Sequence, residues 1–500
     1  MKKDITDMRG TIEFLKSIGD IVTIKEEVDP KWEKAAILKA LDGGPAFFFE
    51  KTKGYPGAKT MANVFARFDR LAKIFDCKDA KELRFKCVDA IRNPIPPKEV
   101  KDAPCQEVVI TKNIDVYGTI PAVSHTPRDG ARVFGSANAL FPPKYARGGH
   151  EISFKRMHFR GKDWGSFTAS PGTHGEAILF MDHREEDVPV TINITSSPAV
   201  HMMSGAGMIH VIIPLGTDEL AIAGGLEGSP IEIVKAKTQD AWSVAKAEYV
   251  IEGYLSPEKI WETEEAEKVG KEDATPFFPE WTGYLGKAWK SRKFVATAIT
   301  HRKNPILYDW VADAFDGENV GSSLMEACFY ELANRLVPGL CLDCVKPTSL
   351  RWAGGVIYQF KKRRPRDEGY QRNVLSLALA AQPGIRLVIG VDDDVDINNM
   401  DDVMWAIMTR ANPQTGAYIF SAAGARGIAA QPLENAQVTF GTGGGLAIDA
   451  TVPFLQKGRF ERPSYIVNQI DLKKWLTEDQ IKAIRAQQSE YARSMSARGV

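Results

Sequence analysis

Short segments with β-strand character run through the middle of the chain and constrain its fold more than any other feature. They lie at residues 107–111, 132–137, 153–159, 190–194, 210–213 and 293–299, and turn-forming residues separate them. Many short strands of this kind predict a barrel or a sandwich, because βαβ units would place a helix between successive strands. Helical insertions are expected near residues 176–181 and 243–248.

Mixed helix and strand patterns flank this β-rich region. Before it, the patterns predict helices at 8–17, 31–41 and 62–75 and strands at 21–24 and 46–49, followed by a proline-rich linker at 93–97. After it, they predict a long helix at 322–335, strands at 356–360 and 386–391, helices at 369–381 and 401–409, and an exposed helix at 477–492. Alternation of this kind predicts an α/β layer on each side.

We therefore expect five parts along the chain. They are an N-terminal α/β segment (1–105), a β-barrel region (106–316), a linker helix (317–337), a C-terminal α/β domain (338–470) and a C-terminal helix (471–500) that reaches a neighbouring subunit.

The charge balance excludes some classes of partner. Lysine plus arginine and aspartate plus glutamate number 64 each, so no net basic field attracts nucleic acid or an anionic membrane. No segment reaches the roughly 18 apolar residues of a membrane span, and we expect a soluble, cytoplasmic protein. A basic run at 361–366 is interpreted as a solvated loop or subunit contact; the alternative is a site for an anionic substrate tail, such as a coenzyme A phosphate.

Three motifs are interpreted as structural. Cys341 and Cys344 form a C-x-x-C without a second pair, which favours buried thiols over a redox or zinc site. The acidic run at 392–396 lacks the glycine and the closing glutamate of a calcium loop, so it is expected to end a strand and lead into a helix. The glycine-rich run at 441–445 lacks the lysine of a phosphate-binding loop and is expected to form a turn.

The stretch 150–234 carries the candidate chemistry. One histidine, His174, and two carboxylates, Glu151 and Glu219, lie on separate strands or loops there, as a divalent metal with oxygen and imidazole ligands requires. By themselves, dispersed residues of these types are more often surface or core groups.

The order of motifs in this stretch resembles the UbiD family of reversible decarboxylases, which use prenylated FMN. Arg156 is followed eighteen residues later by His174, and Glu219 precedes the glycine-rich run 223–234 (AGGLEGSPIEIV). Further similar blocks lie at 8–24, 46–55, 385–410 and 446–451. The resemblance implies a mixed fold of α/β and β parts, with a split β-barrel that holds the flavin and a long helix that joins it to the C-terminal α/β domain.

The resemblance also implies the ligands of a metal and of the cofactor. Glu151, His174 and Glu219 match the positions that bind a divalent metal, although the family usually has asparagine where this chain has Glu151. Two carboxylates and one imidazole suit manganese or iron(II) better than zinc. Met203 and Ser204 match positions near a potassium ion and the flavin phosphate. The full set implied to bind the cofactor is Ser153, Phe154, Arg156, Thr173, His174, Met203, Ser204 and Glu219.

Two residues are implied to be catalytic. Arg156 matches the arginine at the reactive edge of the flavin, and Glu280 matches the acid that protonates the carbon after CO₂ leaves. The family carries a second glutamate five residues earlier, which pairs with the arginine, and this chain has Thr275 there. Asp273 or Glu272 could take its place. The loss of that glutamate suggests room for a bulkier acid.

The function implied is the reversible, non-oxidative decarboxylation of an aromatic acid or of its aryl-CoA thioester, for example phthaloyl-CoA. We expect a homo-oligomer, a dimer or a hexamer, whose cofactor a flavin prenyltransferase supplies. The rival hypothesis is a non-catalytic, cofactor-binding or scaffolding subunit of a multi-subunit carboxylase, supported by Thr275 and Glu151. A weaker rival is an FMN reductase built on the same barrel.

Overall fold

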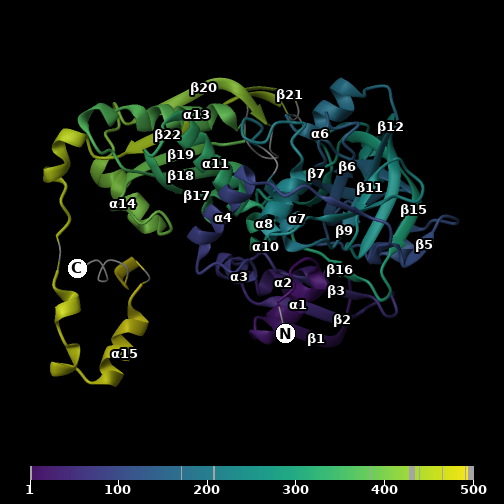
Figure 1. Ribbon diagram of the computed structural model, residues 1–500, viewed down its shortest axis with the longest axis horizontal. Coiled ribbons are helices and arrows are strands. Elements are labelled where there is room, and N and C mark those ends of the chain that lie inside the picture. Colours follow the sequence, from purple (N-terminus) through teal and green to yellow (C-terminus); the bar gives the residue numbers. More distant parts are fainter. Residues whose placement is uncertain are drawn as a thin grey trace.

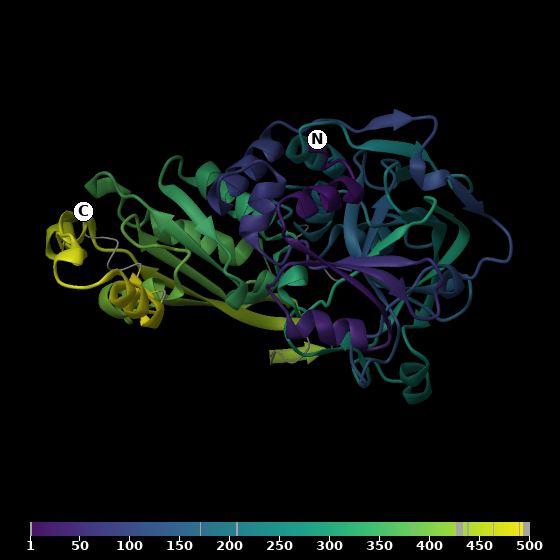
Figure 2. The ribbon, with the colours of Figure 1, turned by 90° about the horizontal axis from the view of Figure 1, so that it is seen from below.

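The protein was analysed as a computed structural model, which describes residues 3–170, 172–206, 209–382, 384–426, 434–437, 440–463, 465–489 and 491–493. The β-barrel and the C-terminal α/β domain lie beside each other, the N-terminal layer lies below them, and the last segment extends away from the C-terminal domain (Figure 1). The view from below shows the N-terminal helices and strands lying along the barrel (Figure 2). The predicted combination of a β-barrel and α/β parts is confirmed.

The N-terminal layer is a mixed sheet whose order is β1, β2, β3, β16. Its elements are α1 (Met8–Ser17), β1 (Ile21–Val28), α2 (Glu33–Ala40), β2 (Ala46–Thr52), β3 (Lys59–Ala62), α3 (Phe68–Ile74) and α4 (Ala80–Arg92). The fourth strand, β16 (Ile306–Tyr308), comes from beyond the barrel and pairs with β3 in parallel.

The helix predicted over 62–75 is partly wrong, because its first residues belong to a strand and a turn. Ala62 pairs with Phe47 in the sheet. The carboxylate of Asp316 then accepts hydrogen bonds from the backbone nitrogens of Asn63 (2.6 Å) and Phe65 (2.7 Å), so the helix begins only at Phe68. Asp316 is distant in the sequence and follows the barrel. Its buried carboxylate therefore determines the conformation of this segment, although the local apolar pattern is helical.

Six strands close into the barrel, in the order β12, β9, β6, β7, β8, β15, with β12 paired back to β15. Their bounds are β6 (Phe134–Phe141), β7 (Glu151–Phe159), β8 (Trp164–Phe167), β9 (Val188–Ile194), β12 (Tyr249–Trp261) and β15 (Lys290–His301), and β5 (Val108–Ile110) extends the edge. Side chains from alternate positions of these strands fill the interior, including Met157, Phe159, Ile192, Ile251 and Phe294. The interior is therefore a packed core and not a channel.

Four short elements lie around the barrel. They are β4 (Lys98–Val100), β10 (Glu232–Lys235) and β11 (Trp242–Val244), which form a small sheet, and α6 (His174–Glu176), which a helical turn over Ala177–Asp182 continues. The insertion predicted near 176–181 is therefore helical. The helix predicted at 243–248 is wrong, because its start pairs with β10 as β11. The strand predicted at 210–213 is also wrong, because these residues form turns.

Two buried helices, α7 (Pro198–Ala206) and α8 (Glu219–Glu227), were not predicted. All nine residues of α7 are buried, and α8 buries seven of its own. A helix that is apolar on every side gives no amphipathic period, so the pattern that reveals a surface helix is missing. These two helices matter because they carry Met203, Ser204 and Glu219.

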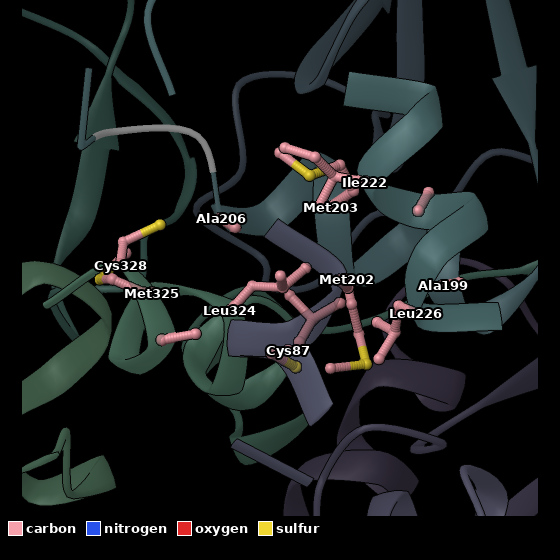
Figure 3. Close-up of a cluster of buried hydrophobic side chains, with 14 of the residues drawn as sticks. Cys87, Ala199, Met202, Met203, Ala206, Ile222, Leu226, Leu324, Met325 and Cys328 are labelled. Atoms are coloured by element: carbon pink, nitrogen blue, oxygen red, sulfur yellow. The ribbon is translucent and has the colours of Figure 1, made fainter. Parts of the chain in front are cut away.

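The predicted linker helix is α11 (Ser322–Leu336), and it packs at the centre of the molecule. Its apolar residues meet side chains from α4, α7 and α8 in one cluster (Figure 3). The residues labelled there are Cys87, Ala199, Met202, Met203, Ala206, Ile222, Leu226, Leu324, Met325 and Cys328. This shared core holds α7 and α8 rigidly behind β7.

The C-terminal domain is a sheet in the order β17, β18, β19, β22, β20. Its elements are β17 (Cys341–Val345), α12 (Arg351–Gly354), β18 (Gly355–Phe360), α13 (Tyr370–Ala381), β19 (Leu387–Asp392), α14 (Met400–Arg410), β20 (Ala417–Arg426), β21 (Glu434–Gln437) and β22 (Phe440–Ala450). The turn predicted at 441–445 is wrong, because these residues pair with β20 inside β22. As predicted, the acidic run ends a strand and leads into a helix, and Cys341 and Cys344 are buried free thiols. The other four cysteines are buried free thiols as well.

The segment after residue 453 leaves the body of the molecule as an extended arm (Figure 1). Its elements are short 3-10 turns and α15 (Glu478–Gln487), and the described residues of these elements include no buried side chain. Several large apolar side chains are exposed along it, including Leu455 (85%), Tyr465 (68%) and Trp475 (68%). Among the described residues, no helix has the length and apolar character needed to cross a membrane.

Candidate active site

Arg156 lies on β7 between two carboxylates. Its Nη1 donates to Oε1 of Glu280 at 2.6 Å, and its Nε and Nη2 donate to the two oxygens of Glu262 at 3.2 and 2.9 Å. The guanidinium carbon is 4.6 Å from the centre of the Phe277 ring, and the side chain is 14% exposed. The arginine is therefore fixed in place by charge on two sides and by an aromatic ring.

Glu280 follows the short strand β13 (Pro276–Pro279), which pairs with β14 (Leu285–Lys287). The turn between these strands is closed by Gly283, whose nitrogen donates to the Glu280 carbonyl at 2.9 Å and whose φ is +81°. Burial raises the pKa of the Glu280 carboxyl and the charge of Glu262 raises it further, whereas Arg156 lowers it. A raised pKa is what a carboxyl group needs to act as a general acid near neutral pH.

Glu262 was not predicted, although it is the carboxylate that holds Arg156. It follows the end of β12, and its side chain is fully buried. Besides Arg156, its carboxylate accepts hydrogen bonds from the Trp289 nitrogen at 2.8 Å and from the Thr168 hydroxyl. The sequence separates Arg156 from Glu262 by 106 residues, and no local motif connects them.

Glu272 and Asp273, which could have replaced the family glutamate missing at Thr275, do not pair with Arg156. Glu272 accepts a hydrogen bond from the Lys290 nitrogen at 3.0 Å, and the charged groups that influence Asp273 are Lys287 and Lys271. Neither makes one of the hydrogen bonds described above for Arg156. Thr275 itself is only 3% exposed, and its carbonyl accepts from the Ala288 nitrogen. The absence of a glutamate at this position therefore does not open space for a larger substrate.

The three residues expected to bind a metal gather at the start of β7 and of two helices. Nδ1 of His174, the first residue of α6, lies 3.3 Å from Oε1 of Glu219, the first residue of α8. The other Glu219 oxygen accepts from the Ile152 nitrogen at 2.7 Å. Burial, and then the charge of Glu219, raise the pKa of Glu151 to about 7.

Two ligand atoms in this group have no protein partner. Oε2 of Glu151 and Nε2 of His174 are buried without a hydrogen bond in the part of the chain that the structure describes. The same described residues contain no group of three His, Cys, Asp or Glu side chains already arranged to hold a metal ion. The donor types and the two unpartnered atoms fit a divalent cation.

Two further residues of this region were missed by sequence reasoning. Lys155 is buried, and a Cβ on Gly175 would lie 3.3 Å from its Nζ, so its charge lies beside the first turn of α6. The ring of His210 stacks on His174, with centroids 4.1 Å apart. Alternation along β7 should have pointed to Lys155, because it shares a face with Glu151 and Ser153.

The other face of β7 carries Phe154 and Arg156. The ring of Phe154 meets Trp310 at 4.5 Å and stacks on the buried His201 at 5.7 Å. Since neighbouring residues of a strand point to opposite faces, Ser153 and Phe154 do not line one continuous wall. The candidate site consequently has an ionic part around Glu151 and a reactive part around Arg156, separated by the thickness of one strand.

The remaining residues expected to bind the cofactor have structural partners. Thr173 caps α6 by accepting from the Glu176 nitrogen at 3.2 Å. Met203 belongs to the central apolar cluster, and the Ser204 hydroxyl donates to the Val200 carbonyl at 2.9 Å. The described contacts neither identify a potassium site nor use the side chain of Met203 for one.

The basic run at 361–366 is largely neutralised within its own domain. Lys361 pairs with Asp393 at 2.8 Å, Lys362 is buried against Glu368 at 3.1 Å, and Arg364 pairs with Asp367 at 2.9 Å. These contacts fit the interpretation as a structural loop and remove the main support for an anionic substrate tail.

Comparison with known proteins agrees with this architecture. Three family models match, described as the N-terminal (residues 12–86), Rift-related (98–313) and C-terminal (319–450) domains of 3-octaprenyl-4-hydroxybenzoate carboxy-lyase, UbiD. Their order reproduces the N-terminal layer, barrel and C-terminal domain seen in the structure. The fold and the site thus define a carboxy-lyase, and the chain belongs to the UbiD family.

Several relatives are similar over most of their length. Gallate decarboxylase of Lactiplantibacillus plantarum is 30% identical over 88% of this chain and 92% of its own. The structure of 3,4-dihydroxybenzoic acid decarboxylase from Enterobacter cloacae has a TM-score of 0.82 at 26% identity, covering 94% of this chain and 98% of its own. An evolved dimeric form of HmfF from Pelotomaculum thermopropionicum, in complex with prFMN, has a TM-score of 0.79 at 25% identity and covers 94% of this chain and all of its own.

Proposed function

We propose that this enzyme decarboxylates a small, free aromatic acid with prenylated FMN as cofactor. The observation that carries the proposal is the Arg156 guanidinium held 2.6 Å from a carboxyl group whose pKa is raised. The names of the relatives, gallate decarboxylase and 3,4-dihydroxybenzoic acid decarboxylase, support an aromatic acid as the substrate class. The local pairing of the basic run and the buried Thr275 favour the free acid over an aryl-CoA thioester.

Prenylated FMN, when bound, supplies the electron sink that an aromatic carbon needs when it loses CO₂. Glu151, His174 and Glu219 would hold a divalent metal, manganese or iron(II), that neutralises the flavin phosphate. Lys155 adds a positive charge on the same face. Potassium near Met203 and Ser204 belongs to the same proposal and rests on the family resemblance alone.

Arg156 and Glu280 act on the substrate. Arg156 offers a planar cation that attracts the substrate carboxylate and fixes its position. After CO₂ departs, Glu280 donates its proton to the carbon that carried the carboxylate, and it recovers a proton from water in the next turnover. Its turn lies at the domain boundary, where a Cβ on Gly283 would come within 2.9 Å of the Arg351 guanidinium. Arg351, which also pairs with Glu318 at 3.5 Å, therefore brings the C-terminal domain next to this turn.

The assembly is proposed to be a homo-oligomer, with a flavin prenyltransferase as the source of its cofactor. The exposed apolar side chains that recur along the arm after residue 453 support the oligomer, because covering apolar surface with a neighbouring subunit lowers the free energy.

The experiment is expression with and without a flavin prenyltransferase, followed by mass and absorbance of the bound cofactor. The purified protein is then assayed for exchange of ¹³CO₂ into gallate, 3,4-dihydroxybenzoate, 4-hydroxybenzoate and benzoyl-CoA. Exchange into one of the free acids, dependent on the prenylated cofactor, is the expected result. Exchange confined to the thioester would refute the substrate class, and loaded protein without any exchange would support the non-catalytic subunit.

A further inference from the structure

The two carboxylates that hold Arg156 differ in how they are hydrogen-bonded. Glu262 accepts four hydrogen bonds, two from Arg156, one from the Trp289 nitrogen and one from the Thr168 hydroxyl. An ionised carboxylate offers about four acceptor positions, whereas a protonated one must use an oxygen as a donor. The four donors around Glu262 therefore occupy these positions and leave no oxygen free to act as a donor.

Glu280 has fewer partners and remains accessible. It accepts from Arg156 and from the backbone of Trp281, and its side chain is 22% exposed. A carboxyl group with two donors can gain a proton without leaving a buried donor unpaired. Of the two carboxylates that bind Arg156, Glu280 is therefore the one that can change its protonation state.

We propose that Glu262 is the permanent counter-ion of Arg156 and a positioning residue for the reaction, which frees Glu280 to carry the exchangeable proton. The inference rests on the proposed decarboxylation and adds a residue that lies 106 positions from Arg156 in the sequence. Glu262 neutralises the guanidinium, so Glu280 need not remain ionised to do so. Its two hydrogen bonds to Nε and Nη2 also fix the plane of the guanidinium, which points Nη1 at Glu280.

The charged groups around Glu280 determine what a change at Glu262 will do. They are Arg156 from β7 and Glu262, which follows the end of β12. Glu262 is the negative member of this set, and its charge opposes ionisation of Glu280. Removing that charge must therefore stabilise the ionised form of Glu280 and lower its pKa.

The test compares Glu262→Gln with Glu262→Asp. The first removes the charge and nearly keeps the shape, and the second keeps the charge and shortens the side chain. A matched control is Glu258→Gln, on the same strand, whose carboxylate pairs with Lys293 at 2.8 Å and is 55% exposed. Unfolding midpoints of all variants are measured first.

The first readout needs no cofactor and no turnover. The protein is labelled with ¹³C at the glutamate carboxyl carbon, the Glu280 signal is assigned from its absence in Glu280→Gln, and its titration is followed by NMR. Glu262→Gln should lower the pKa of Glu280 by about one pH unit, the lower end of the effect of a nearby charge. Glu262→Asp and Glu258→Gln should leave it within a few tenths.

The second readout is the pH profile of kcat/KM in the loaded enzyme. Glu280 works when protonated, so activity is lost as pH rises through its pKa, and this alkaline limb should move to lower pH in Glu262→Gln only. Both Glu262 variants should lose at least about tenfold in kcat because the guanidinium is misplaced. An unchanged Glu280 titration in a folded Glu262→Gln protein overturns the proposal, and so does a shift of equal size in Glu262→Asp. If the protein decarboxylates nothing, the NMR titration still decides the role of Glu262.

Discussion

Replacing Glu280 by glutamine tests the proposed chemistry most directly. The amide has nearly the same shape and can still accept a hydrogen bond from Nη1 of Arg156, which lies 2.6 Å from Oε1 in the enzyme. It cannot donate a proton to carbon. We therefore expect Glu280→Gln to bind cofactor and substrate normally and to lose at least about 10²-fold in turnover, the lower end for losing an acid-base group.

This loss corresponds to about 2.7 kcal/mol of transition-state free energy, since each factor of ten is about 1.36 kcal/mol. The free energy of unfolding should fall by only about 1 kcal/mol, because the guanidinium keeps a hydrogen bond to a neutral amide while Glu262 still neutralises Arg156. A larger loss of transition-state stabilisation than of folding stability would therefore indicate that Glu280 acts in the chemistry and not only in the structure.

The assay measures turnover of the aromatic acid, cofactor occupancy by absorbance and the unfolding midpoint on one preparation. In the unmodified enzyme, activity should fall above the raised pKa of Glu280, because the acid must carry its proton, and this limb should be absent in the variant. Glu272→Gln is the control, because Glu272 bonds to the Lys290 nitrogen and not to Arg156. Near-normal turnover of a fully loaded Glu280→Gln enzyme would refute the assignment and move the proton donor elsewhere, with Asp273 tested next.

Three other outcomes are expected. His174→Ala should lose divalent metal and flavin together, and full occupancy of both by elemental analysis and absorbance would contradict the proposed site. Arg84→Met should lower the free energy of unfolding in urea by about 3–5 kcal/mol, because it removes the buried cation between Glu326 and Asp343 and leaves Asp343 only the exposed Lys81 at 3.6 Å; a loss below about 1 kcal/mol would contradict that reasoning. Deleting residues 471–500 should give a smaller oligomer by light scattering, and an unchanged oligomer size would exclude this part of the arm as a subunit contact.

The sequence by itself determined the elements whose pattern is local. The helix at 322–335 and the alternation of strands and helices after it could be predicted, because each of these elements turns one apolar side towards the core. Several short strands near one another likewise predicted a barrel or a sandwich, and the family resemblance implied the barrel. Arg156 and Glu280 could be identified because their flanking residues match a family motif, which remains a prediction about their role.

Only the tertiary structure decided which distant segments meet. The pairing of β12 with β15 closes the barrel, and β16 returns to complete the first sheet. The helices α7 and α8 were missed because they are buried on nearly all sides and show no polar face. Glu262 was missed for a related reason: its partner Arg156 is brought to it across the barrel, and a contact between residues 106 apart leaves no periodic or local signal in one sequence.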